Sequence, residues 1–513
     1  ALLFLLGFSV VFGVAQFQSS PGYMDADYYY ATGLVLAEGQ GFTEPFLWNY
    51  LDNPSGLPHP SHAYWMPMTS MISAVGMWIA GASNFAAAQW PFLLISALIP
   101  LITAALAFSF TSRRDLALIS GLLAVFSGYY IPYLSTTDTF GIYMLLGGCF
   151  FLACKIPRLW LRALTFGLLA GLMHLSRADG IMWLAIGGFS LFFSRERLSR
   201  KNLLSTFYYL FILFFGYLII LIPWFVRNLS AFGTPLSPGG LQMLWLTRYD
   251  QLFSYPPGQL TMQYWLASGW DAILASRWWA LKFNLGTTLG VQGSVILLPL
   301  IVIGVWQLRQ NKRVQLGLFA WVLTFSVMTV IFPFAGARGG FFHSGTALQT
   351  LWWALAPLGL ERLVAWISHW RNWDIEGPQR VFQYMLVGIS FLLTLGIFWG
   401  RVIGSDPRKP AWDMNMNRYR VVEQSLLEDG ASPGDVIVVS NPPGYFAATG
   451  RSTIAVSDGD IQVLEMVAAR YGGNYLFLTP LDTPHDLQII FENPEGWFDY
   501  LGEVEGGVLF AIR

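Results

Sequence analysis

Long apolar runs alternate with short polar segments over residues 1–400. A membrane-spanning helix needs roughly 20 apolar residues, or somewhat fewer where helices bend or pack against one another. The run at 62–80 is short and is interrupted by Pro67 and Gly76, so we expect a helix that lies at or dips into the membrane interface. The other runs predict eleven membrane-spanning helices, at residues 1–17, 86–111, 116–133, 139–154, 163–176, 179–194, 203–226, 288–307, 315–333, 346–367 and 381–400.

The pattern changes after residue 400, where shorter periodic segments follow one another. "NRYRVVEQSLLED" and "DIQVLEMVAARYGG" have helical spacing, whereas "GDVIVVS" and "NYLFLTP" are typical of short buried strands. We therefore expect two domains. A transmembrane domain covers residues 1–400 with loops at 18–65 and 229–287, and a soluble α/β domain covers 401–513.

Composition agrees with a membrane protein. Only 12% of the 513 residues are charged and 55% are hydrophobic, whereas soluble domains carry about 25% charged residues. The net charge of -1 argues against nucleic acid as a partner. The two cysteines, Cys149 and Cys154, lie in one apolar run, which excludes a disulfide framework or a zinc cluster of cysteines. The sequence thus predicts a polytopic α-helical membrane protein with a C-terminal α/β domain.

Charge indicates which loops face the cytoplasm, because short loops rich in Lys and Arg stay on that side. The loop 18–65 has neither Lys nor Arg. With the assigned spans, five basic segments fall on the opposite side, at 112–115, 155–162, 194–201, 309–313 and 362–380. We expect a plasma-membrane protein whose segments 18–65, 229–287 and 401–513 face the extracytoplasmic side.

Acids and arginines gather at the outer ends of the predicted spans. Asp25 and Asp27 follow the first apolar run, and Asp138 directly precedes another. Arg177 lies in the turn "HLSRADG", and Arg227 lies near the end of an outward span. A single loop acid is usually just solvated, but ionisable groups at headgroup depth are costly unless they are paired, wet or functional.

Such groups suit transfer from an anionic lipid. Arginine binds a phosphate through two parallel hydrogen bonds, and an acceptor hydroxyl needs a base during attack. Asp25 or Asp27 can be that base, since no Lys or Arg lies near them in sequence to neutralise the carboxylate.

Five motifs, in order over residues 1 to about 400, resemble those of the GT-C superfamily of membrane glycosyltransferases, nearest to bacterial protein O-mannosyltransferases and aminoarabinose transferases. They are "MDADYYYATGLVLAEGQGF", "HAYWMPMTSMISAVGMWIAG", "TTDTF", "SRADG" and "PWFVRNLSAFGTPL".

The resemblance implies an inverting transfer of a sugar from a polyprenyl-phosphate donor to a hydroxyl of a protein, lipid or glycan. It assigns the base to Asp25, the neighbouring acid to Asp27 and the second acidic motif to Asp138, and it puts Arg177 and Arg227 near the donor phosphate. The sequence departs from the family where Ala26 separates the two acids and where Ala178 replaces a proline.

Further residues are candidates for the same site. Arg338 and His343, in the glycine-rich segment "FAGARGGFFHSG", and Tyr29 are candidates for donor binding. His59 and His62 are candidate ligands of a divalent cation, which is the cofactor that the sequence suggests. The segment "SNPPGYF" (440–446) is either a loop over the site or an ordinary turn.

Two other functions stay open at this point. One is an oligosaccharyltransferase or polymer ligase that uses a glycan on a lipid pyrophosphate. The other is a non-enzymatic lipid or glycan transporter, although such proteins usually show paired repeats with polar groups at the membrane midplane.

Overall fold

The computed structural model describes residues 1–193, 200–372, 374 and 376–512. The chain forms two compact units, each built from three separate segments. The helical unit comprises Ala1–Phe17, Trp90–Arg227 and Arg277–Gly404. The mixed unit comprises Gln18–Gln89, Asn228–Ser276 and Ser405–Arg513.

Helices lying wholly or mostly in the helical unit are α1 (Leu2–Ala15), α4 (Phe85–Thr111), α5 (Arg114–Val125), η1 (Gly128–Tyr133), α6 (Thr139–Ala153), α7 (Leu159–Ser176), η2 (Ala178–Ile181), α8 (Met182–Phe193), α9 (Arg200–Phe232), α12 (Gly269–Thr287), η5 (Thr288–Gln292), α13 (Leu297–Gln307), α14 (Lys312–Ser326), η6 (Val327–Ile331), α15 (Pro333–Ala335), η7 (Gly336–Gly340), α16 (Phe341–Ser344), η8 (Gly345–Leu348), α17 (Gln349–Arg371), α18 (Glu376–Phe398) and η9 (Trp399–Ile403). The η elements are short 3₁₀ or π helices.

Several of these helices can cross a membrane, which confirms a multi-pass membrane protein. Within the described residues, five are long and apolar enough: Phe85–Thr111, Leu159–Ser176, Leu204–Phe232, Lys312–Ile331 and Gly377–Ile403. The pair Gly269–Gln292 and Leu297–Gln307, bent by 89°, is a sixth candidate. Shorter apolar helices form at Leu2–Ala15, Thr139–Ala153 and Ala178–Phe192.

The count of eleven spans is not confirmed, because several apolar runs form shorter or broken helices. In the run 116–133, α5 ends at Val125, Gly128 adopts a left-handed φ of 61°, and the 3₁₀ helix η1 contains Pro132. Proline and left-handed glycine both interrupt an α-helix. The segments near 194–199 lie partly outside the described residues.

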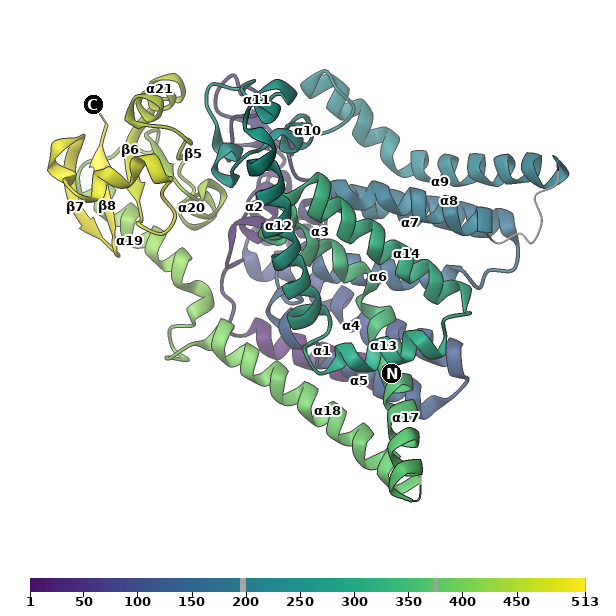
Figure 1. Cartoon of the computed structure of the whole chain (residues 1–513). Coiled ribbons are helices and arrows are strands. Elements are labelled where there is room, and N and C mark those ends of the chain that lie inside the picture. The colour runs from purple at the N-terminus through teal and green to yellow at the C-terminus, as the bar shows by residue number, and fades with distance from the viewer. Residues whose placement is uncertain (194–199, 373, 375, 513) are drawn as a thin grey trace. The chain divides into compact units, whose positions relative to one another are not determined.

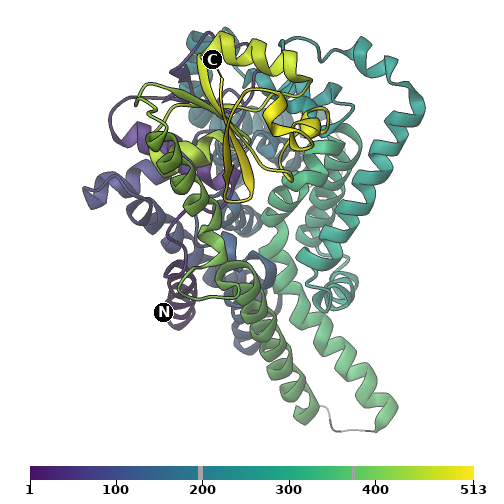
Figure 2. The same cartoon turned by 90° about the vertical axis from the view of Figure 1, so that its left-hand side faces the viewer.

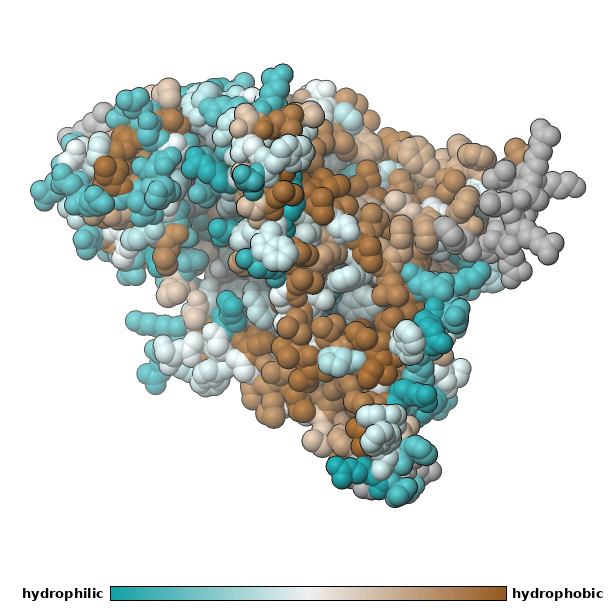
Figure 3. Space-filling view, viewed as in Figure 1, coloured by the Kyte–Doolittle hydropathy of each residue, from teal (hydrophilic) through white to brown (hydrophobic). Residues whose placement is uncertain are grey.

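Glycines let the helices of this unit approach closely. A Cβ added at Gly359 of α17 would lie 1.8 Å from Leu300 O of α13, and one at Gly167 of α7 would lie 2.0 Å from Leu213 O of α9. Small residues at such crossings are typical of membrane helices. Figure 1 shows α7, α8 and α9 running side by side. On the surface in Figure 3, apolar side chains cover these helices. Phe207 and Phe211 of α9 are among the exposed apolar residues.

The mixed unit contains α2 (Met24–Ala37), β1 (Thr43–Glu44), β2 (Phe46–Leu47), β3 (His59–Pro60), α3 (Met68–Ala80), α10 (Pro238–Gln242), η3 (Met243–Trp245), η4 (Tyr249–Phe253), α11 (Met262–Ala267), η10 (Ala411–Asp413), α19 (Met414–Glu428), β4 (Val436–Val439), α20 (Pro442–Thr449), β5 (Thr453–Ala455), α21 (Ile461–Tyr471), β6 (Gly473–Leu478), η11 (His485–Phe491), η12 (Pro494–Gly496), β7 (Asp499–Val504) and β8 (Gly507–Ala511). The helices and strands predicted from the four quoted C-terminal segments, α19, β4, α21 and β6, are confirmed.

A six-stranded sheet in the order β2-β5-β4-β6-β8-β7 organises the mixed unit. Strands β2, β5, β4 and β6 run parallel to one another. Strand β8 pairs antiparallel with β6, and β7 pairs antiparallel with β8. The β7–β8 hairpin, yellow in Figure 2, ends beside the C-terminus. Strand β2 comes from the first loop, and Ser254 of the second loop bridges to Asp458. Most of the three polar segments expected on one side of the membrane therefore belongs to one unit.

The central strands of the sheet are buried on both faces. In β4, Val436 and Val438 join the apolar cluster that includes residues of α21, whereas Ile437 and Val439 join the cluster that includes residues of α19. A strand covered on both faces is expected to be continuously apolar, which explains the sequence "VIVV".

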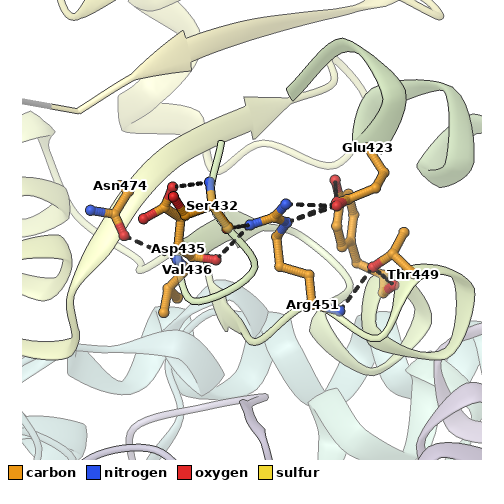
Figure 4. A network of polar contacts seen from close by, with 8 residues as sticks. Glu423, Ser432, Asp435, Val436, Thr449, Arg451 and Asn474 are labelled. Carbon is orange, nitrogen blue, oxygen red and sulfur yellow. Dashed lines mark hydrogen bonds and ion pairs between the residues drawn. The ribbon is translucent and has the colours of Figure 1, made fainter. Parts of the chain in front are cut away.

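A buried arginine ties the loops of this sheet together. The Arg451 side chain is 3% exposed and forms an ion pair with Glu423 of α19. Its guanidinium also donates to the backbone oxygens of Ser432 and Asp435, in the turn before β4 (Figure 4).

The short apolar run 62–80 forms α3, which begins after Pro67 and ends at Gly81 with a left-handed φ of 62°. It packs on α2 so closely that a Cβ at Gly33 would lie 2.7 Å from Ser73 Cβ. Met71, Trp78 and Ile79 stay exposed on α3. Its place at the membrane interface stays a prediction.

Candidate active site

The first turn of α2 carries both acids of the first motif. The helix begins after Tyr23, whose extended backbone carries the chain into it, and Asp25 and Asp27 follow in the first turn. Backbone N–H groups at a helix N-terminus favour negative charge there. Asp25 is partly exposed, whereas Asp27 is only 4% exposed. The two carboxylates thus share one helix end but differ in their access to water.

Asp27 is held by the C-terminal segment of the same unit. Asn441 Nδ2 donates a hydrogen bond of 2.9 Å to Asp27 Oδ2. Asn441 is the N-cap of α20, and its Oδ1 accepts from Gly444 N at 3.2 Å. The segment "SNPPGYF" is therefore neither a loop nor an ordinary turn, because its prolines occupy the first helical positions, where proline is favoured.

Burial changes the acidity of Asp27. Loss of water around the carboxylate raises its pKa from 3.8 to about 7, the hydrogen bond from Asn441 opposes this change, and the nearby charge of Asp25 adds to it. A carboxylate that titrates near neutral pH can exchange a proton at physiological pH.

Tyr29 lies next to these acids in sequence but points into packed core. It is 1% exposed and belongs to an apolar cluster with Tyr28 and Phe46. The ring centroids of Tyr29 and Trp65 are 6.3 Å apart. Its role in donor binding stays a prediction.

The two histidines of the first loop have separate partners. His59 Nε2 lies 2.7 Å from Asp52 Oδ2. His62 Nε2 lies 3.0 Å from Ser70 Oγ, and its Nδ1 lies 2.7 Å from Ser61 Oγ. Their assignment as ligands of one cation stays a prediction.

The Asp52–His59 pair lines a small pocket within the mixed unit. The pocket is lined by Tyr28, Glu44, Trp48, Asn49, Asp52, His59, Ala63, Tyr64 and Trp65. Tyr28 connects it to α2, since its hydroxyl donates to Glu44 Oε2 and accepts from His62 N, both at 2.7 Å. Within the described residues, the buried His59 Nδ1 has no hydrogen-bond partner.

In the helical unit the second acidic motif meets His343. Asp138 is the N-cap of α6, and its Oδ1 accepts from the backbone and the hydroxyl of Thr139. Asp138 Oδ2 lies 3.3 Å from His343 Nε2, and His343 Nδ1 lies 2.9 Å from Gly339 O. Both residues are buried.

This geometry sets two oxygen atoms against the imidazole of His343. Both of its ring nitrogens face oxygen atoms that accept hydrogen bonds, whereas a neutral imidazole has only one N–H. The contact with Asp138 thus brings an imidazole nitrogen and a carboxylate oxygen together. Imidazole nitrogen and carboxylate oxygen are ordinary ligands of divalent cations.

The three candidate arginines occupy different surroundings. Arg177 ends α7, and its Nε donates to Asp179 Oδ1 at 2.9 Å. Arg227 lies in α9 with its guanidinium carbon 4.8 Å from the ring centroid of Trp224. Arg338 is exposed in η7, one residue before Gly339, whose φ is 121°. The pairing of Arg177 with Asp179 fixes one edge of the guanidinium.

Comparison by sequence finds no relative: no protein-family model matches the chain, and no curated protein is significantly similar. Solved structures do match. ArnT from Cupriavidus metallidurans bound to undecaprenyl phosphate is 12% identical with a TM-score of 0.58, over 99% of this chain and 97% of that chain.

The apo oligosaccharyltransferase from Archaeoglobus fulgidus is 12% identical with a TM-score of 0.54, over 96% of this chain and 73% of that chain. The complex of AglB from the same organism with an inhibitory peptide and a dolichol-phosphate is 12% identical with a TM-score of 0.51, over 92% and 69%. ArnT and AglB are both GT-C membrane glycosyltransferases. The resemblance is confirmed at the level of the fold: this chain has the fold of the GT-C superfamily.

Proposed function

We propose that this chain is a membrane glycosyltransferase that moves a sugar from a polyprenyl-phosphate donor to an acceptor hydroxyl, with inversion at the anomeric carbon. The observation that carries the proposal is the pair of acids in the first turn of α2, one of them with a pKa of about 7, in a chain with the GT-C fold. The ArnT structure bound to undecaprenyl phosphate supports a donor of this class.

Asp25 is the general base in this proposal. The acceptor oxygen forms a bond to the anomeric carbon while the bond from that carbon to the phosphate oxygen breaks, and the acceptor proton passes to Asp25. The polyprenyl phosphate leaves with the bonding electrons. Because like charges disfavour each other's ionisation, an ionised Asp27 makes Asp25 more basic.

The positive groups act on the donor phosphate. Arg177, Arg227 and Arg338 are proposed to bind its oxygens, since guanidinium groups match phosphate geometry. Asp138 and His343 can hold a divalent cation, which would offset the charge of the leaving phosphate.

An oligosaccharyltransferase is the second candidate, because the AglB fold matches most of this chain. Coverage favours the first candidate, since this chain spans 97% of ArnT but 73% of the apo archaeal enzyme. The two differ in donor, so parallel assays with lipid-monophosphate sugars and lipid-pyrophosphate glycans separate them.

The test measures radiolabelled sugar leaving undecaprenyl-phosphate-linked donors with purified full-length variants. Asp25→Asn keeps the size of the side chain but cannot accept a proton, so we expect a loss of ~10²–10⁴ in rate with little change in donor affinity. Asp115→Asn, in an exposed ion pair with Arg113, is the control and should stay active.

Asp27→Asn should be milder than Asp25→Asn. If Asp27→Asn has no transfer activity while Asp25→Asn has a normal rate, then Asp27 is the general base and Asp25 is the neighbouring acid. Normal rates in both variants would refute the proposed base and, with it, this reading of the first motif.

A further inference from the structure

We propose that Asn441 is a positioning residue that keeps the carboxylate of Asp27 charged and fixed beside Asp25, so that the C-terminal segment of the chain takes part in the reaction. This inference rests on the proposed function for its effect on catalysis. Its structural basis is a single contact between residues 414 positions apart in sequence, the 2.9 Å bond from Asn441 Nδ2 to Asp27 Oδ2.

The orientation of the Asn441 amide is determined by its second contact. Gly444 N is a donor and lies 3.2 Å from Oδ1, so the acceptor end of the amide must face the start of α20. The NH₂ end is then the one that faces Asp27. A donor fixed in this way stabilises the charged form of a carboxyl group more than the neutral form.

Gly444 makes the approach of α20 to this carboxylate possible. A Cβ added there would lie 2.4 Å from Asn441 Nδ2 and 2.7 Å from Asp27 Oδ2. Even an alanine would therefore displace one of the two groups. The segment "NPPG" thus supplies a donor, a rigid start for the helix and a gap for the carboxylate.

Few other groups can set the charge of Asp27. On its own helix the neighbour is Asp25, which opposes ionisation. On α19 it is Tyr419, whose pKa burial raises well above its ordinary value, so it stays neutral.

The remaining elements packed on α2 do not replace Asn441. The sequence of α3 has no ionisable group. Glu44 of β1 accepts from Tyr28, and Tyr445 of α20 donates to Glu423. Among the described residues, Asn441 is therefore the side chain that donates a hydrogen bond to Asp27.

The first experiment titrates Asp27 without any substrate. Difference infrared spectroscopy of the full-length protein in lipid nanodiscs follows the carboxyl stretch with pH, and Asp27→Asn identifies the band. Asn441→Ser keeps a good N-cap for α20 but cannot reach Asp27 as a donor. We expect its Asp27 midpoint to lie about one to two pH units above that of the wild-type protein.

Asn441→Asp also keeps the N-cap but puts a second carboxylate beside Asp27, so its midpoint should rise further. Asn474→Ser is the matched control, because Asn474 Oδ1 accepts from Val436 N at 3.0 Å in the same unit. Its Asp27 midpoint should stay at the wild-type value. An unchanged midpoint in Asn441→Ser, or an equal shift in Asn474→Ser, would overturn the inference.

The second experiment is the pH profile of sugar transfer from undecaprenyl-phosphate-linked donors. With the midpoint raised by one to two units, Asn441→Ser should lose roughly 5- to 50-fold in rate at pH 7 and return to within about twofold of wild type at pH 9. A loss that is equal at both pH values would show a structural defect and overturn the role. The infrared titration decides the role of Asn441 even if the transfer assay contradicts the proposed function.

Discussion

Replacing Arg451 by methionine would remove a buried charge from the mixed unit. The guanidinium makes five hydrogen bonds: Nε donates to both oxygens of Glu423 at 3.0 and 2.8 Å, Nη2 donates to Oε1 at 2.7 Å, and Nη1 donates to Ser432 O at 2.6 Å and Asp435 O at 3.0 Å (Figure 4). Methionine fills much of the same space but provides no donor.

The expected loss of stability comes from Glu423, which the substitution leaves without its buried partner. Glu423 is 17% exposed and would keep its charge, while the Tyr445 hydroxyl at 3.0 Å would remain as its donor among the described residues. Removing one partner of a buried ion pair costs about 3–5 kcal/mol. At 1.4 kcal/mol per factor of ten, the sheet should open roughly 100- to 4,000-fold more often.

Hydrogen exchange of the β4 amides in the full-length protein measures this opening directly. Arg470→Ala is the control, because Arg470 is exposed in the same unit and should contribute at most ~1 kcal/mol. Arg451→Met combined with Glu423→Gln should recover much of the loss, since no buried charge is then left unpaired. Exchange in Arg451→Met as slow as in Arg470→Ala would refute the reasoning.

Three further predictions concern pH, packing and topology. Burial raises the pKa of Asp27 from 3.8 to about 7 in the folded protein, so the stability linked to its protonation is fully present below pH ~4 and is lost as pH rises through 7. From pH 4 to 8 the wild type should lose up to ~4 kcal/mol relative to Asp27→Asn, and parallel changes of stability with pH in the two proteins would contradict this. Gly359→Ala should lower the melting temperature because its Cβ would meet the backbone of the neighbouring helix. Gly388→Ala is the control, because its Cβ would point into open space. Equal melting temperatures in the two variants would disprove the close crossing. The positions 432 and 310 are both exposed. In a cysteine-free background, a membrane-impermeant thiol reagent applied to intact cells should label Ser432→Cys but not Gln310→Cys. The reverse pattern would refute the prediction that the C-terminal segment faces the extracytoplasmic side.

Local patterns predicted the elements of this fold well. Apolar runs marked the helices, and "VIVV" marked β4, because each element needs only its own residues to show its periodicity. Helix length was predicted less well, since an apolar run does not show where Gly128 and Pro132 will break it. The apolar pattern therefore predicted the order of the helices, whereas the count of eleven spans is not confirmed.

Contacts between distant segments were not predictable in the same way. Strand β2 has only two residues, and nothing in its sequence indicates that it pairs with β5, about 400 residues later. The contact of Asn441 with Asp27 was missed for the same reason. The signal available was asparagine followed by two prolines and a glycine, which indicates a helix start but not the partner of its cap.

The pairing of β2 with β5 has a consequence for biosynthesis. The first loop leaves the ribosome early, yet its strand has no neighbour in the sheet until Thr453–Ala455 has been made. Asp27 likewise receives its amide donor only when residue 441 has been translated. A nascent or truncated chain can insert its helices but cannot complete the mixed unit. Synthesis of an incomplete chain should therefore yield an inserted protein whose mixed unit is unfinished, and maturation of the protein becomes a late, post-insertion step.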